Sequence, residues 1–204
     1  MGFLAWLLHP DELIAAFRYT MHNAPASENI DKLQVSAGMK RCYDFLVQTS
    51  RSFAGVIQEL NPQLRDVICL FYLILRGLDT IEDDMSIPLG KKKSLLQNFH
   101  KFIFEPGWTF TESGPEEKDA SLLVNFDVII DEFLKIDEKY QKVIADITYR
   151  MGHGMAEFTD KDVEMINDYD MYCHYVAGLV GYGLSDLFAV SGLEDASFRD
   201  IKDL

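Results

Sequence analysis

The chain has 204 residues, of which 48% are hydrophobic and 12% aromatic, and its formal net charge is −14. This apolar content is enough for one substantial core, so we expect a single domain or a large part of one. The strong acidity, with no basic stripe to offset it, argues against binding to nucleic acid.

Long apolar stretches separated by charged ones, with only 13 Gly and 6 Pro, are typical of an all-α protein. The periodicity predicts helices over residues 11–22, 35–47, 53–60, 62–84, 94–104, 122–136, 138–156 and 168–191. The stretch Thr49–Ser52 separates the second helix from the third, and its serines can cap the third. The only basic run, Lys91–Lys93, is interpreted as a solvated helix start. The segment Glu105–Ser121 predicts a surface loop.

The helix over residues 62–84 is the most apolar part of the chain. Asn61 and Pro62 form a typical helix start, with Asn as the N-cap and Pro at the first helical position. The run Val67–Leu75 leaves no polar face, so we expect this helix to be surrounded by protein. It should end before Pro88.

The last predicted helix combines glycines with a long apolar run. Its small residues, Gly181 and Gly183 among them, indicate close approach of another helix or a ligand. The run from Tyr175 onward is nearly long enough to span a bilayer. Because Ser185 and Asp186 interrupt it, we favour a buried helix of a soluble protein.

The cysteines and the N-terminus bear on the cellular compartment. Cys42, Cys69 and Cys173 form no Cys-x-x-Cys pair and lie among apolar neighbours, which predicts buried free thiols in a reducing compartment. The start of the chain has neither a basic region nor a small-residue cleavage site, so it is a poor signal peptide.

One face of the central helix carries polar groups. Tyr72, Arg76, Asp79 and Asp83 follow one another at helical spacing, with Glu82 beside them. Such a face offers carboxylate oxygens to Mg²⁺, and the arginine can bind the same phosphate as a bidentate donor. A lone Asp-x-x-x-Asp would favour an Arg–Asp ion pair at a solvated helix end. The buried helix and the shared stripe favour a magnesium–diphosphate site.

Two further segments carry candidate chemistry. At the helix break, Ser50, Arg51 and Ser52 present hydroxyls, a guanidinium and free amides that can bind diphosphate without a metal. Taken alone, this segment is more simply an ordinary serine cap. Tyr172 lies in an aromatic stretch at the start of the last helix, where it could carry a proton and where aromatic faces could stabilise a carbocation. Taken alone, that stretch is more simply core packing.

Four blocks of the chain together resemble squalene synthases. They are Tyr43–Phe53, Phe71–Met85, Met151–Phe158 and Tyr172–Gly183. Their order and spacing are similar to the family over nearly the whole chain. The Asp-Thr-x-Glu-Asp-Asp form at residues 79–84 resembles squalene synthases rather than phytoene synthases, and the whole resembles fungal members.

The resemblance implies an all-α isoprenoid synthase fold. Two farnesyl diphosphates would couple head to head to presqualene diphosphate, which NADPH would reduce to squalene. Mg²⁺ is assigned to Asp79 and Asp83 with support from Glu82, and the diphosphate to Ser50, Arg51, Ser52 and Arg76. Tyr172 would take part in proton transfer, and Phe53 would line the path of the cation. Asp44 departs from the basic residue expected for NADPH binding.

The family also carries a second aspartate-rich motif on a later helix, and no such helix precedes Leu204. We therefore expect residues 1–204 to be the N-terminal portion of a single synthase domain, incomplete at the C-terminus and inactive alone. The family's C-terminal anchor, which holds it at the cytosolic face of the endoplasmic reticulum membrane, is also expected to be absent. This chain alone should then be soluble or aggregate. The alternatives are phytoene-synthase-like coupling without reduction, and a non-catalytic helical protein that pairs with a full-length partner.

Overall fold

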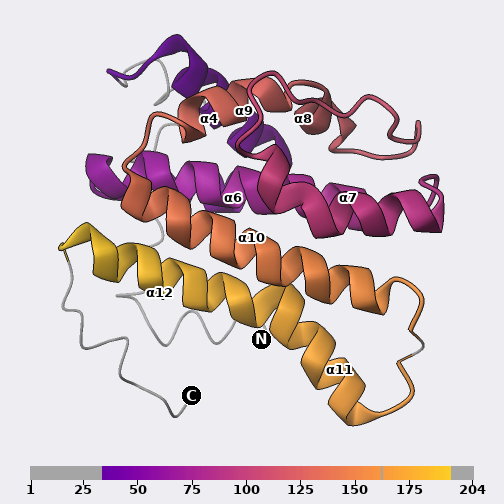
Figure 1. The fold of residues 1–204 in the computed structure, drawn as a ribbon. Coiled ribbons are helices and arrows are strands. Elements are labelled where there is room, and N and C mark those ends of the chain that lie inside the picture. The colour runs from indigo at the N-terminus through magenta and orange to yellow at the C-terminus, as the bar shows by residue number, and fades with distance from the viewer. Residues whose placement is uncertain (1–33, 162, 194–204) are drawn as a thin grey trace, which may run out of the picture.

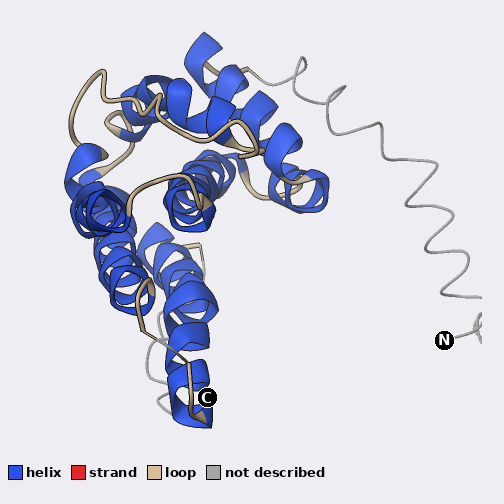
Figure 2. Ribbon diagram, turned by 90° about the vertical axis from the view of Figure 1, so that its right-hand side faces the viewer, coloured by secondary structure: helices blue, strands red, loops and turns tan. Residues whose placement is uncertain are grey.

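The computed structural model describes residues 34–161 and 163–193, and these ranges are helical, without a strand (Figures 1 and 2). The helices are α4 (Ala37–Thr49), α5 (Arg51–Gln58), α6 (Pro62–Asp83), α7 (Leu89–Phe102), α8 (Ala120–Val124), α9 (Phe126–Phe133), α10 (Glu138–Phe158), α11 (Ile166–Cys173), the π-helical turn η1 (His174–Gly178) and α12 (Leu179–Ser191). The all-α prediction is confirmed there. The helix predicted over residues 11–22 and the carboxylates of residues 200–203 lie outside the described residues.

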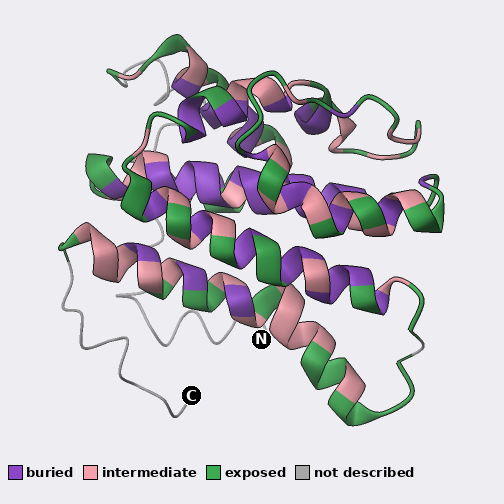
Figure 3. Cartoon of the chain, in the orientation of Figure 1, coloured by how far each residue is buried: buried purple, intermediate pink, exposed green. Residues whose placement is uncertain are grey.

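Helix α6 is the centre of the fold. Its continuous apolar run gives it no solvated face over most of its length, as the prediction required, and Figure 3 shows it largely buried. It contacts α4, α5, α8 and α9 on one side and α7, α10 and α12 on the other. Asn61 caps its start by accepting a hydrogen bond from the N–H of Gln63 at 3.0 Å.

Helices α7 and α10 pack together closely along their length (Figure 1). A Cβ atom at Gly152 would lie 2.2 Å from the backbone oxygen of Leu96, so only glycine permits this approach. Gly183 does the same between α12 and α6, where a Cβ would lie 2.6 Å from the ring of Phe71. This confirms the predicted close approach at Gly183, whereas Gly181 faces open space.

Two predicted helices differ from the structure. The helix expected over residues 122–136 is divided into α8 and α9 at Asn125, whose side-chain amide donates to the carbonyl of Ser121 at 2.8 Å and so competes with the helical backbone pattern. The helix expected over residues 94–104 begins earlier, at Leu89. Its polar first turn hides the apolar periodicity by which a helix is recognised.

The basic run at the start of α7 is not uniformly solvated, which corrects its interpretation. Lys91 and Lys93 form surface ion pairs with Glu112 and Asp160. Lys92 between them is only 7% exposed. Its aliphatic stem is packed inside the fold, so the run is a helix start with one buried member.

The segment predicted as a surface loop, Glu105–Ser121, is tied to the core by its aromatic residues. The Trp108 ring packs against three phenylalanine rings, those of residues 99, 102 and 126. Phe110 is buried, and its N–H donates to the carbonyl of Leu123 at 3.0 Å. The loop therefore has a fixed path across the ends of the neighbouring helices.

The C-terminal helical stretch runs from Ile166 to Ser191 and includes η1. The Tyr175 ring in η1 lies where a Cβ of Gly154 would be, 2.2 Å from its nearest carbon. This stretch is long and apolar enough to cross a membrane by length and composition, which by itself is weak evidence, and 17% of its most apolar window is buried. The prediction of a buried helix is therefore wrong for most residues of this stretch, which are exposed or half-buried.

The predicted state of the thiols is largely confirmed. Cys42 and Cys69 are buried and free, and Cys173 is free but half-buried. Burial raises the pKa of the Cys42 thiol to about 12, so that this group stays protonated at neutral pH.

Candidate functional site

Two members of the polar stripe of α6, Tyr72 and Arg76, are hydrogen-bonded to each other. The Arg76 guanidinium donates to the Tyr72 hydroxyl from Nε at 3.4 Å and from Nη2 at 3.3 Å. The Tyr72 ring in turn lies 5.5 Å from the Phe53 ring at the start of α5. Phe53 is itself 56% exposed, so its other face remains open. The structure thus brings the α5 motif and the α6 stripe together.

The predicted helix break between α4 and α5 occurs at Ser50. Its N–H donates to the carbonyl of Leu46 at 2.9 Å and closes α4, while its hydroxyl accepts from the N–H of Phe53 at 3.3 Å and begins α5. The Ser52 hydroxyl lies 3.3 Å from that of Ser50. Arg51 and Ser52 are both exposed. Hydroxyls and a guanidinium therefore stand together at a helix start, where an anion is favoured.

The carboxylates on α6 are crowded and only partly neutralised. Burial is the main reason that the pKa of Asp79 is raised to about 7. The charge of Arg76 lowers this pKa, and the charges of Glu82 and Asp83 raise it further. Burial also raises the pKa of Glu82, again with help from Asp83. Since burial is the main cause of both raised pKa values, a bound cation would stabilise the charged form of these carboxylates.

Tyr172 comes from α11, 90 residues along the chain, and meets the same carboxylates. Its hydroxyl donates to Oε1 of Glu82 at 3.2 Å, and its ring lies 5.6 Å from that of Phe158. Burial and the neighbouring charge of Glu82 raise the pKa of Tyr172 to about 12. At neutral pH the phenol therefore stays protonated and donates a hydrogen bond to Glu82.

Asp84, the last carboxylate of the acidic run, has a structural role. It is buried, and its two oxygens accept hydrogen bonds from the backbone and hydroxyl of Ser86 and from the N–H of Gly114. Burial acts to raise the pKa of Asp84, but these hydrogen bonds outweigh it, so the pKa is lowered from its usual value. This carboxylate holds the loop after α6 and is not offered to a ligand.

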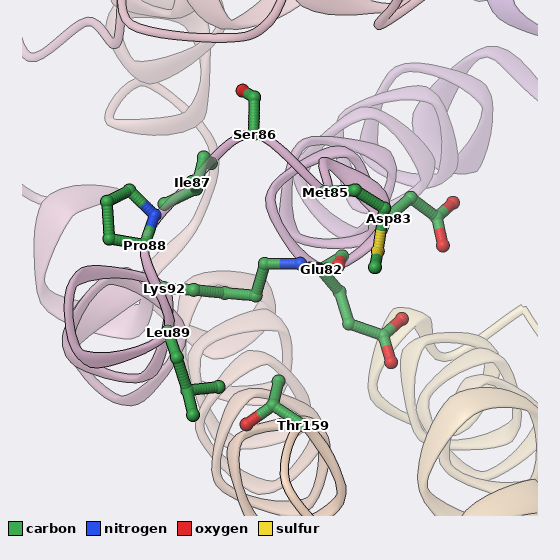
Figure 4. Close-up of a pocket in the computed structure, with 9 residues that line it drawn as sticks. All are labelled: Glu82, Asp83, Met85, Ser86, Ile87, Pro88, Leu89, Lys92 and Thr159. Atoms are coloured by element: carbon green, nitrogen blue, oxygen red, sulfur yellow. Dashed lines mark hydrogen bonds between the residues drawn. The ribbon is translucent and has the colours of Figure 1, made fainter.

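Two residues near the stripe were not predicted. Asp119 lies 3.8 Å from Nε of Arg76 and reaches it from the segment interpreted as a surface loop. Lys92 lines a cavity of about 580 Å³ together with Glu82, Asp83 and Thr159 (Figure 4). Both lie outside α6, so helical spacing could not relate either of them to the stripe. The aromatic residues at 108 and 110 were the one signal that the loop returns to the core.

The donors fit Mg²⁺ as one wall of a site. Asp79, Glu82 and Asp83 supply the oxygen ligands that this ion prefers, from a single helix. Within residues 34–161 and 163–193, no three acidic, histidine or cysteine side chains are placed to hold an ion by themselves. Completion would require oxygens from a ligand, from water or from another part of the protein.

Comparison with known proteins agrees with the resemblance seen in the motifs. Residues 46–201 match the family model described as squalene/phytoene synthase. Squalene synthase of Mus musculus is 53% identical over 196 residues, covering 96% of this chain and 47% of that protein. Squalene synthase of Schizosaccharomyces pombe is 50% identical over 192 residues, covering 91% and 42%. The chain thus spans about half the length of the curated relatives it matches.

Solved structures show the same fold. A structure described as the complex of TcSQS with the ligand E5700 superposes with a TM-score of 0.77 at 44% sequence identity. It covers 82% of this chain and 48% of that one. The isoprenoid synthase fold is therefore confirmed for the described helices. With a family model matching more than half of its residues, the chain belongs to the squalene/phytoene synthase family.

Proposed function

We propose that this chain carries the first half of a squalene synthase active site. The whole protein would couple two farnesyl diphosphates to presqualene diphosphate and convert this, with NADPH as reductant, to squalene. The observation that carries the proposal is the meeting of three distant segments: Phe53 on Tyr72, Arg76 on Tyr72, and Tyr172 on Glu82.

The proposed roles follow from the chemistry of each group. Ser50, Arg51 and Ser52 would hold a diphosphate at the start of α5, and Arg76 would hold it from α6. Asp79, Glu82 and Asp83 would bind Mg²⁺, which when present neutralises the diphosphate and makes it a better leaving group. The Phe53 ring, one residue after Ser52, packs on Tyr72, whose hydroxyl accepts from Arg76, so the start of α5 and the stripe of α6 are neighbours and could bind one diphosphate together.

The aromatic groups would act on the hydrocarbon part of the substrate. The exposed face of Phe53 can stabilise an allylic cation through its π-system and keep water from it. The Tyr172 phenol, already hydrogen-bonded to a carboxylate, can pass or hold a proton at its oxygen. We further propose the cytosolic face of the endoplasmic reticulum membrane as the place of action, by likeness to squalene synthases.

Binding tests the half-site directly. Titration calorimetry of the purified chain with pyrophosphate and with farnesyl diphosphate should show tighter binding when Mg²⁺ is present than when it is absent. Asp79→Asn should abolish the Mg²⁺-dependent part of this binding because it removes a central carboxylate charge. Asp146→Asn, which breaks a surface ion pair with Arg150 on α10, is the matched control and should bind as the wild type does. Unchanged binding in Asp79→Asn would refute the metal assignment.

Turnover tests the second part of the proposal, that this chain is inactive alone. A wall of carboxylates from one helix cannot hold metal ions from two sides or exclude water, so we expect no squalene from farnesyl diphosphate, Mg²⁺ and NADPH. Squalene formation by the 204-residue chain would contradict this. In a full-length protein, product formation without NADPH consumption would instead favour phytoene-synthase-like coupling.

A further inference from the structure

Lys92 is a buried lysine beside the proposed metal-binding wall. It lies in the first turn of α7 and is 7% exposed, and its Nζ donates to the backbone carbonyl of Glu82 in the last turn of α6. Figure 4 shows its side chain running from α7 to the end of α6. Burial of an ammonium group is costly unless it is paired, so this contact requires a reason in the local structure.

The end of α6 supplies a partner for that ammonium group. The last four carbonyls of a helix lack intrahelical donors, and together they carry roughly half a negative charge. The carbonyl of Glu82 is one of these four. Lys92 therefore satisfies a carbonyl that the helix itself leaves open, at the residue whose side chain meets Tyr172.

Helix α7, which carries Lys92, packs closely against α10. Leu96, one turn further along α7, is buried, and its carbonyl approaches Gly152 so closely that no side chain fits between them. This close contact between α7 and α10 opposes a shift of α7 next to Lys92.

The anchored residue faces the cavity. Glu82 and Asp83 at the end of α6, Lys92 on α7 and Thr159 after α10 all line the space of about 580 Å³ (Figure 4). A ligand that meets these carboxylates must find them in a fixed position, which depends on the last turn of α6 staying helical.

We propose that Lys92 is a positioning residue, whose ammonium group holds the last turn of α6 so that Glu82 and Asp83 meet a magnesium–diphosphate ligand. The effect on ligand binding rests on the proposed function, whereas the contact between Lys92 and Glu82 does not. The two effects of Lys92 on Mg²⁺ binding have opposite signs. Its positive charge alone would repel the ion, whereas its hold on the helix end would favour binding. The proposal states that the hold is the larger effect.

Removal of the ammonium group separates these effects. Lys92→Met keeps the aliphatic stem and should weaken Mg²⁺-dependent pyrophosphate binding by about tenfold, as is usual when a group that orients metal ligands is lost. Lys93→Met is the matched control, and it should change binding by less than about twofold because it breaks only a surface pair. Equal or tighter binding in Lys92→Met would overturn the proposal.

Hydrogen exchange tests the anchor without reference to the function. In Lys92→Met the amides of residues 82–84 should exchange faster than in the wild type, whereas Lys93→Met should leave them unchanged. Equal exchange in Lys92→Met would refute the anchor. Absence of Mg²⁺-dependent binding in the wild type would refute the proposed function instead, and exchange would still decide the role of Lys92.

A conservative variant covers loss of folding in Lys92→Met. Lys92→Arg retains a cationic donor and should keep slow exchange at the end of α6 and most of the Mg²⁺-dependent binding. Fast exchange in a folded Lys92→Arg protein would show that the residue matters only for packing, which would also overturn the proposal.

Discussion

Ser50 ends one helix with its backbone and begins the next with its side chain, and it is also one of the proposed diphosphate ligands. Asp79 similarly belongs both to the local helix and to a crowded set of charges. At the scale of single residues, structural and functional roles therefore overlap. The two roles can be separated by comparing nearby residues that share the functional role but not the structural one.

Ser50 and Ser52 form such a pair. Ser50→Ala removes the N-cap of α5 and should lower the free energy of unfolding by about 1 kcal/mol. Ser52→Ala removes an exposed hydroxyl that is not the cap and should change it by less than about 0.5 kcal/mol. Urea denaturation measures both. If both hydroxyls bind diphosphate, both variants should lose affinity for it, and equal loss of stability would contradict the assigned cap.

The raised pKa of Asp79 predicts a dependence on pH. The folded carboxyl binds its proton up to about pH 7 while the unfolded one loses it near its usual value, so stability without metal falls as the pH rises through this range. Mg²⁺ competes with that proton. Its affinity should therefore rise by about tenfold between about pH 6 and about pH 8.

Calorimetry at several pH values, in the presence of pyrophosphate, measures this dependence. An affinity for Mg²⁺ that stayed level or fell over the interval would show that Asp79 does not exchange its proton for the metal ion.

At the scale of elements, glycines set how closely the helices approach. Two glycines of α10, two residues apart, contact different elements: Gly152 lies against α7 and Gly154 lies against η1. The π turn of η1 begins two residues after Tyr172, and π turns occur often at functional sites. The position of Tyr172 against Glu82 thus depends on how the stretch Ile166–Ser191 packs on α10.

Two glycine-to-alanine changes test the packing of α7. Gly152→Ala places a methyl group against the Leu96 carbonyl and should destabilise the fold by about 1–3 kcal/mol. Gly90→Ala, at a helical position of α7 with open space around it, should stabilise by about 0.4–1 kcal/mol. Urea denaturation gives both values, and opposite signs are the expected result. Similar changes in the two variants would mean that the close approach is not maintained in solution.

At the scale of the whole molecule, the described surface carries apolar side chains that a stable monomer would normally cover. Val56 on α5 is 61% exposed and Ile166 on α11 is 79% exposed. Figure 3 shows that α11 is exposed or half-buried along its length. Exposed apolar surface of this kind favours association with other protein surfaces.

We therefore expect the isolated chain to self-associate with rising concentration, as sedimentation velocity can measure. Ile166→Lys should raise the dissociation constant about tenfold or more, because a buried isoleucine contributes roughly 1.5–3 kcal/mol. Leu134→Lys, at a site 37% exposed at the end of α9, is the control. A monomer at every concentration, or equal effects of the two changes, would contradict this.

Local chemistry along the chain was sufficient for much of this description. The start of α6 at Asn61 and Pro62, its burial, the break at Ser50 and the stripe from Tyr72 to Asp83 all depend on residues within a few turns of one another. Periodicity and capping preferences act over that range, so these features could be predicted from sequence. The resemblance to squalene synthases added the chemistry, and the comparisons confirmed the family and fold.

Contacts between distant segments were decided only by the tertiary structure. Periodicity gave no means to pair Tyr172 with Glu82 across 90 residues, to bring Asp119 to Arg76, or to bury Lys92 within a run of three lysines. Each depends on how helices pack, and packing is set by the shapes of whole surfaces rather than by local preference. The sequence by itself thus determined which helix carries the carboxylates, whereas the fold decided which proton donor and which cation stand beside them.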